Sequence, residues 1–303
     1  CAFSRNSSEG IPMRDILRLL RPRHWIKNAF VFAPLVFALR FTDPASLLRA
    51  GIAFLAFSLA SSIVYIINDL ADREADSNHP AKKQRPLASG AVSPGLAVIT
   101  ACLAGLAALM LALHTGRDFA VVIGIYILLN LAYSFRLKHL VLLDVMAIAA
   151  GFILRILGGG FAVGVPVSRW LFLTTFTLAL FLGFCKRRNE LLLIEGTGGQ
   201  RPVLGQYSER FLDQLILISA TLAVVCYALY TIDAEVVTRL GTPHLLYTLP
   251  LVLYGLFRYL FLIYKKAASG DPAEMLLRDP GLFVTIILWG ALVLLLIWPR
   301  VAG

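Results

Sequence analysis

Long apolar stretches dominate this chain of 303 residues and restrict what it can fold into. An α-helix needs about 20 apolar residues to cross the ~30 Å hydrocarbon core of a bilayer, and several stretches reach that length. A mean hydropathy of +0.77 also exceeds what soluble domains carry. We therefore predict an all-α integral membrane protein, a single polytopic domain over residues 1–303. Its nine transmembrane helices are expected at about residues 26–41, 45–67, 94–114, 118–135, 140–163, 168–185, 211–230, 244–264 and 281–298.

The basic residues indicate how the chain is oriented. Most of the 28 lysine and arginine residues lie at the N-terminus and in every second loop after it. Because cytoplasmic loops carry an excess of these residues, the N-terminal segment 1–25 is predicted in the cytoplasm and the C-terminus outside the plasma (inner) membrane. The net charge of +10 is spread over short loops rather than gathered on one soluble face. Nucleic acid is therefore not expected as a partner.

Residues 68–90 form the most distinctive polar segment and follow the second predicted span on the cytoplasmic side. Asn68, Asp72 and Asp76 are four residues apart and Asp69 lies one position round, so these groups fall within roughly 100° of one helix face. Acidic groups at the C-terminal end of a helix oppose its dipole, which makes a purely stabilising role a poor explanation. Hard oxygen ligands suit Mg²⁺, which binds through one or two carboxylates plus substrate phosphates. We predict that these four residues hold Mg²⁺ on a diphosphate.

Basic residues follow the acidic ones directly. Three bases, Lys82, Lys83 and Arg85, precede a turn. Pro86 fixes the backbone of this turn, and Gly90 lets the backbone approach a ligand closely. We expect these bases to neutralise the remaining phosphate charge. The alternative for the two lysines is that they only mark the cytoplasmic side or contact anionic lipid.

Further polar residues lie in or beside the predicted spans. Pro34 is expected to bend or interrupt the first span. Arg155 lies about 16 Å deeper than Asp144 on nearly the same helix face, which favours a polar cavity, although a buried ion pair with another helix is an alternative. The glycines at 158–160 favour close packing or a helix break over a phosphate loop. The candidate substrate-binding residues outside segment 68–90 are Lys27, Asn28, Tyr133, Lys138, Asp144, Arg155, Lys186, Arg187 and Glu190.

The order of these motifs resembles that of the UbiA superfamily of membrane prenyltransferases. Asn68-Asp69-x-x-Asp72-x-x-x-Asp76 followed by Arg85-Pro86-Leu87-Ala88-Ser89-Gly90 is similar to the first aspartate-rich motif of that superfamily. The resemblance covers essentially the whole chain. It implies nine helices around a central cavity for the lipid, with a Mg²⁺–phosphate site under cytoplasmic loops.

One departure from the aromatic prenyltransferases is informative. Those enzymes carry a second aspartate-rich motif near the end of the sixth span, where this chain has Lys186-Arg187-Arg188-Asn189-Glu190. This feature, with Arg21-Pro22-x-x-Trp25-x-Lys27-Asn28, resembles a branch that transfers 5-phosphoribose from phosphoribosyl diphosphate (PRPP) to a polyprenyl (decaprenyl) phosphate for cell-wall arabinan. The resemblance implies that homo-oligomers can form, that the bases share the phosphates, and that the catalytic residues are Asp69, Asp72, Asp76 and Arg85.

Two other interpretations stay open. The first is a UbiA-type prenyl diphosphate transferase acting on an aromatic or quinone acceptor, which the missing second aspartate motif argues against. The second is a polyprenyl-phosphate transporter with Asp144 and Arg155 along its path. An odd number of spans and the one-sided clustering of polar groups argue against transport.

Overall fold

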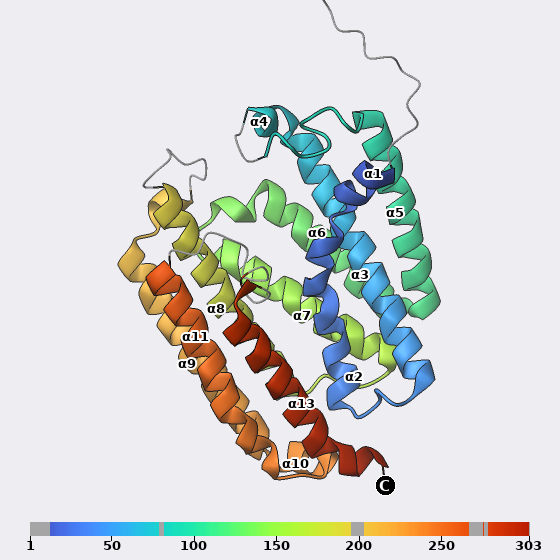
Figure 1. Ribbon diagram of the computed structural model, residues 1–303. Helices are drawn as coiled ribbons and strands as arrows, with labels where there is room; N and C mark the ends of the chain where they lie inside the picture. Colours follow the sequence, from blue (N-terminus) through green and yellow to red (C-terminus); the bar gives the residue numbers. More distant parts are fainter. Residues whose placement is uncertain (1–12, 79–81, 195–202, 267–274, 276–277, 303) are drawn as a thin grey trace, which may run out of the picture.

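The computed structural model describes residues 13–78, 82–194, 203–266, 275 and 278–302, and all regular structure in these ranges is helical (Figure 1). The first half of the chain forms α1 (Met13–Leu20), the 3₁₀ helix η1 (Pro22–Phe32), α2 (Ala33–Phe37), α3 (Pro44–Ala71), α4 (Arg73–Ser77), α5 (Pro94–Thr115), α6 (Arg117–Phe135) and η2 (Leu137–His139). The second half forms α7 (Leu143–Val163), α8 (Arg169–Ile194), η3 (Leu204–Gln206), α9 (Glu209–Ile232), α10 (Ala234–Leu240), η4 (His244–Thr248), α11 (Leu249–Lys266) and α13 (Pro280–Ala302).

Eight helices in the described ranges are long and apolar enough to cross a membrane: α3, α5, α6, α7, α8, α9, α11 with the preceding η4, and α13. They correspond to the second through ninth predicted spans. Their starts follow local sequence signals. The Asp43 and Ser93 side chains accept hydrogen bonds from the first-turn amides of α3 and α5, and a proline follows each cap.

The first predicted span, residues 26–41, is not one continuous α-helix. The chain runs through the 11 residues of η1 and then the five residues of α2. A 3₁₀ helix rises about 2.0 Å per residue and an α-helix 1.5 Å, so the two together cover about 30 Å, which is the thickness of the hydrocarbon core. Pro34 stands in the first turn of α2, as expected for an interruption. This segment packs between α3 and α7.

Two of the three consecutive glycines of α7 allow this close packing. A Cβ added at Gly159 would lie 2.1 Å from the carbonyl oxygen of Val31 in η1, and one at Gly158 would lie 2.5 Å from the ring of Phe57 in α3. Gly158–Gly160 lie inside α7, so they mark close packing and not a helix break. Small residues at helix contacts serve this purpose in membrane proteins generally.

Replacing Gly159 by alanine should therefore destabilise the protein, because the backbone of η1 must move away from α7. We expect a cost of about 1–3 kcal/mol, measured as a lower midpoint of thermal unfolding in detergent. Gly124→Ala in α6 is the matched control, since a Cβ there meets nothing within 4 Å. It should leave stability unchanged or raise it slightly. Equal effects of the two substitutions would contradict the close contact.

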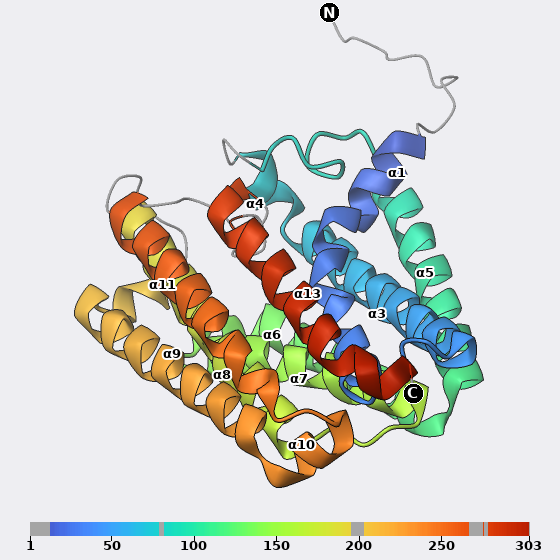
Figure 2. The same ribbon diagram turned by 60° about the horizontal axis from the view of Figure 1, so that its bottom comes forward.

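The alternating helices bring distant polar segments to one end of the bundle. The C-terminal ends of α3, α6, α8 and α11 and the N-terminal ends of α5, α7, α9 and α13 all lie at one end of the bundle. The segment with α4 lies at this same end (Figures 1 and 2). Apolar side chains fill two main clusters. One surrounds Phe57 between η1, α3 and α6, and the other surrounds Phe181 between α8, α9 and α11. α7 contacts helices of both groups.

Candidate active site

The acidic segment folds as two helices rather than the single helix that its spacing predicts. α3 ends at Ala71, and Asp72 caps it before α4 begins. Hydrogen bonds nevertheless continue through the junction, because the Asp72 N–H donates to the Asn68 carbonyl (2.9 Å) and the Asp76 N–H to the Asp72 carbonyl (2.8 Å). The four-residue spacing thus survives the change of helix.

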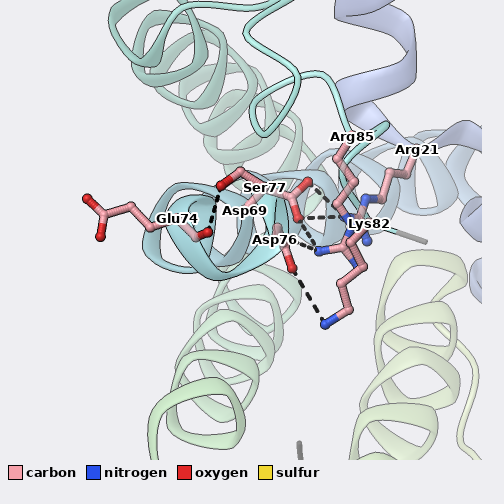
Figure 3. A network of polar contacts seen from close by, with 7 residues as sticks. All are labelled: Arg21, Asp69, Glu74, Asp76, Ser77, Lys82 and Arg85. Atoms are coloured by element: carbon pink, nitrogen blue, oxygen red, sulfur yellow. Dashed lines mark hydrogen bonds and ion pairs between the residues drawn. The ribbon is translucent and has the colours of Figure 1, made fainter. Parts of the chain in front are cut away.

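Asp69 and Asp76 form a buried pair held by cations (Figure 3). Their exposed fractions are 3% and 2%. Arg85 Nη1 donates to Asp69 Oδ1 at 3.0 Å and also to Asp76 Oδ2, while Lys82 Nζ lies 3.5 Å from Asp76 Oδ1. Arg21 Nη2 donates to both oxygens of Asp69 at 2.6 and 2.7 Å. Two carboxylates and three bases therefore meet here. The sequence predicts that Lys82 and Arg85 neutralise phosphate, and in the structure they pair with the carboxylates.

Asn68 and Asp72 differ from this pair. Both are partly exposed, and among the described residues neither side chain has a hydrogen-bond or ion-pair partner. No group of three or more His, Cys, Asp or Glu side chains converges as a metal cage in the described ranges. The donor chemistry still fits Mg²⁺, which takes one or two protein carboxylates and completes its shell with water and phosphate oxygens. Asn68 and Asp72 supply two such oxygen donors at one helix end.

Arg21 is a site residue that sequence reasoning missed, because a basic residue before a membrane span is typical of an ordinary interfacial anchor. Its φ of 53° lies in the left-handed region, which is rare for a residue with a side chain and costs of order 1 kcal/mol. Its guanidinium also lies 5.0 Å from the centroid of the Tyr65 ring. The ion pair with Asp69, 48 positions along the chain, depends on how η1 meets α3.

A second polar group joins the ends of α6, α7 and α8. Arg187 is fully buried and donates to Asp144 Oδ2 (2.5 Å), Glu190 and the Tyr133 hydroxyl (2.9 Å). The structure thus collects four of the predicted binding residues. Each nitrogen of Arg187 donates to protein, however, so this geometry favours a positioning role over the phosphate clamp that the sequence suggested.

Tyr207 completes this second group and was not predicted as a site residue. Its hydroxyl donates to Asp144 Oδ1 (2.8 Å) and accepts from the Leu142 N–H (2.7 Å). Burial raises the pKa of the Tyr207 hydroxyl above its ordinary value, and the Asp144 carboxylate adds to the rise. The phenol therefore stays a neutral donor, which fixes the first turn of α7.

Arg155 lies in a third polar group, deep in the bundle. Its guanidinium donates to Asn28 Oδ1 (2.7 Å), the Gly151 carbonyl (2.8 Å) and the Tyr126 hydroxyl (2.8 Å). Asn28 in turn donates to the Ser58 hydroxyl at 3.1 Å. The predicted residues Asn28 and Arg155 therefore meet, and neutral groups surround the buried cation instead of the carboxylate that an ion pair would need.

The remaining predicted residues are lysines. Lys27 lies in η1, Lys138 in η2 and Lys186 near the end of α8, and all three are half-buried. Lys83 is exposed. Their positions leave basic side chains on three separate elements.

The bundle and these polar groups define a polytopic α-helical membrane protein with a charged site at one end. Residues 29–287 match the UbiA prenyltransferase family, and the chain belongs to this family. A UbiA homolog from Archaeoglobus fulgidus, solved bound to GPP and Mg²⁺, has the same fold with a TM-score of 0.69. It shares 21% identity, and the match covers 95% of this chain and all of that one.

Closer sequence relatives carry a more specific name. The decaprenyl-phosphate phosphoribosyltransferase of Mycolicibacterium smegmatis is 33% identical over 292 residues, which cover 90% of this chain and 89% of the relative. That of Corynebacterium glutamicum is 34% identical over 286 residues, covering 90% and 84%. Together with the family match, these relatives support a membrane transferase of the UbiA type.

Proposed function

We propose that this protein transfers 5-phosphoribose from PRPP to a polyprenyl phosphate, releases diphosphate and requires Mg²⁺. The observation that carries the proposal is the asymmetry of the acidic residues: they gather at α3 and α4, whereas α8 has Lys186-Arg187-Arg188 where a second acidic motif would stand. A single acidic motif with bases nearby suits three separate anionic groups, which are the diphosphate and the 5-phosphate of PRPP and the phosphate of the lipid. The names of the relatives support the same reaction, a pentosyl transfer.

The reaction needs a good leaving group at C1 of the ribose. A phosphate oxygen of the lipid forms the new bond to C1, and the C1–O bond to diphosphate breaks with its electron pair on the diphosphate. The oxygen atoms of Asn68 and Asp72 would hold Mg²⁺, together with those lone pairs of Asp69 and Asp76 that accept no hydrogen bond. The ion would neutralise charge that grows on the leaving diphosphate. Arg85, already between the two buried carboxylates, is positioned to bind the diphosphate beside it.

The lipid phosphate is anionic at neutral pH, so the reaction needs no general base. Lys27, Lys138 and Lys186 are the candidates for the lipid phosphate and the 5-phosphate, because these half-buried bases lie on three separate elements. Arg187 and Asp144 would act on binding indirectly by fixing the turn that carries Lys138. The product, a polyprenyl-linked phosphoribose, suits cell-wall arabinan synthesis from the cytoplasmic side.

A direct assay tests this proposal. The purified protein in detergent, given radiolabelled PRPP, decaprenyl phosphate and Mg²⁺, should form a labelled product that extracts into organic solvent. EDTA should abolish the product and excess Mg²⁺ should restore it, because the diphosphate otherwise leaves without its counterion. Omitting the lipid phosphate is the control for label carried over non-specifically.

The same preparation should also be given geranyl diphosphate and 4-hydroxybenzoate. A prenylated aromatic product, with no labelled lipid from PRPP, would overturn the proposal in favour of an aromatic prenyltransferase. No product from either substrate pair, with a folded protein, would overturn both and favour polyprenyl-phosphate transport.

A further inference from the structure

The short helix α1 presents two different surfaces. Leu19 is fully buried in a cluster with Ile66 of α3 and Leu87, which anchors one face of α1 to the bundle. On the other side, Met13 is 70% exposed and Leu17 is 52% exposed, although both are large apolar side chains. Because they are four residues apart, they form one apolar strip along the helix.

Two arginines border this exposed strip. At 100° per residue, Arg14 and Arg18 lie about 100° round the helix from Met13 and Leu17, and both are exposed. Arg18 reaches Asp15 only at 3.5 Å, with 58% of its side chain exposed, so this surface pair holds it weakly. An apolar strip beside a basic strip is typical of a helix that lies in the interface of a membrane, with its cations at the phosphate level.

The position of α1 agrees with its surfaces. It packs against α3 and lies at the end of the bundle where α4 also lies (Figures 1 and 2). At this same end, Val98 and Ile99 in the second turn of α5 are exposed and continue the apolar belt of the bundle. The exposed strip of α1 therefore lies where a lipid-facing surface gives way to charged loops.

We propose that α1 binds anionic phospholipid headgroups in the leaflet nearest the acidic segment and thereby fixes Arg21 on Asp69. Met13 and Leu17 insert into the acyl boundary, and Arg14 and Arg18 bind lipid phosphates. The chain leaves α1 directly into Arg21, whose N–H donates to the Arg18 carbonyl at 3.3 Å. Because the left-handed backbone of Arg21 is strained, it depends on anchors on both sides. The bound lipid supplies one, and the ion pair with Asp69 supplies the other.

Hydrogen–deuterium exchange tests this proposal without any assay of activity. The full chain is placed in nanodiscs of phosphatidylcholine alone or with 30% phosphatidylglycerol, and exchange is followed in peptides covering residues 13–21 and 22–25. An eight-residue helix frays readily, so its exchange reports how firmly it is docked. We expect about tenfold slower exchange in α1 with phosphatidylglycerol, since each basic residue near an anionic surface strengthens binding several-fold. Exchange should also slow at the start of η1, where the His24 N–H donates to the Arg21 carbonyl.

Matched variants define the outcome. Arg14→Gln with Arg18→Gln should abolish the difference between the two membranes, whereas Arg117→Gln, an exposed arginine at the opposite end of the bundle, should preserve it. Equal exchange in both membranes, or a lipid effect that survives loss of both arginines, would overturn anionic recognition by α1. Slowing of α1 without slowing at residues 22–25 would overturn its link to Arg21.

Discussion

Asp72→Asn is expected to reduce the rate of phosphoribosyl transfer by about 100-fold while leaving the thermal unfolding midpoint unchanged. The carboxylate of Asp72 is partly exposed and pairs with no other described side chain, so the fold does not depend on its charge. The proposed metal site does depend on it, because a neutral amide binds Mg²⁺ more weakly and leaves the diphosphate less stabilised. Initial rates with labelled PRPP, together with a thermal melt, measure both quantities.

Glu74→Gln is the matched control for this substitution. Glu74 lies two residues further on, in α4, and its side chain points away from the carboxylate pair (Figure 3). Removing its charge should change the rate less than twofold. A similar loss of activity in both variants would show that general charge at this end matters, and that Asp72 is no specific ligand. Raising the Mg²⁺ concentration should partly restore the Asp72 variant, since weaker binding is overcome by mass action.

Asp144→Asn should have the largest effect on stability, lowering the thermal unfolding midpoint by about 10 °C. Asp144 and Arg187 are both fully buried, so the substitution removes the buried carboxylate and leaves the guanidinium with the partly exposed Glu190 as its remaining acidic partner. Breaking a buried ion pair from one side costs about 3–5 kcal/mol. For a chain of this size, each kcal/mol corresponds to a few degrees. Differential scanning fluorimetry in detergent measures the shift.

Two further variants separate burial from charge. Asp213→Asn removes an analogous partner from Arg188, at 2.6 Å, but the Asp213 side chain is 35% exposed, so we expect a shift of only a few degrees. The double substitution of Asp144→Leu with Arg187→Met removes both buried charges and should recover part of the lost stability. If the double variant is less stable than Asp144→Asn alone, the loss in Asp144→Asn does not come mainly from the uncompensated charge of Arg187. The hydrogen bonds and packing of the network would then contribute to stability themselves.

The sequence indicates where the acidic cluster lies because several of its residues are close together in the chain. Arg85 lies only 16 positions from Asp69 and nine from Asp76, so the order of acids and bases indicates that they share one site, but not that they form ion pairs with each other. The sequence favours Asp144 as part of a polar cavity with Arg155, and Arg187 as a phosphate-binding residue. Their pairing with each other was not predicted, because α7 and α8 also contact other helices and no local rule chooses among them.

The sequence by itself determined the membrane class, eight of the spans and the charged end, because the length of an apolar stretch and the signs of nearby charges are local properties. Only the tertiary structure decided how the cations are used. Arg21 was not predicted as a site residue and holds Asp69, and Arg187 was expected to bind phosphate and instead is buried among protein partners. The physical reason is that burial and partner choice depend on which helices pack together. That packing is set by contacts such as Gly159 against Val31, which join residues more than a hundred positions apart.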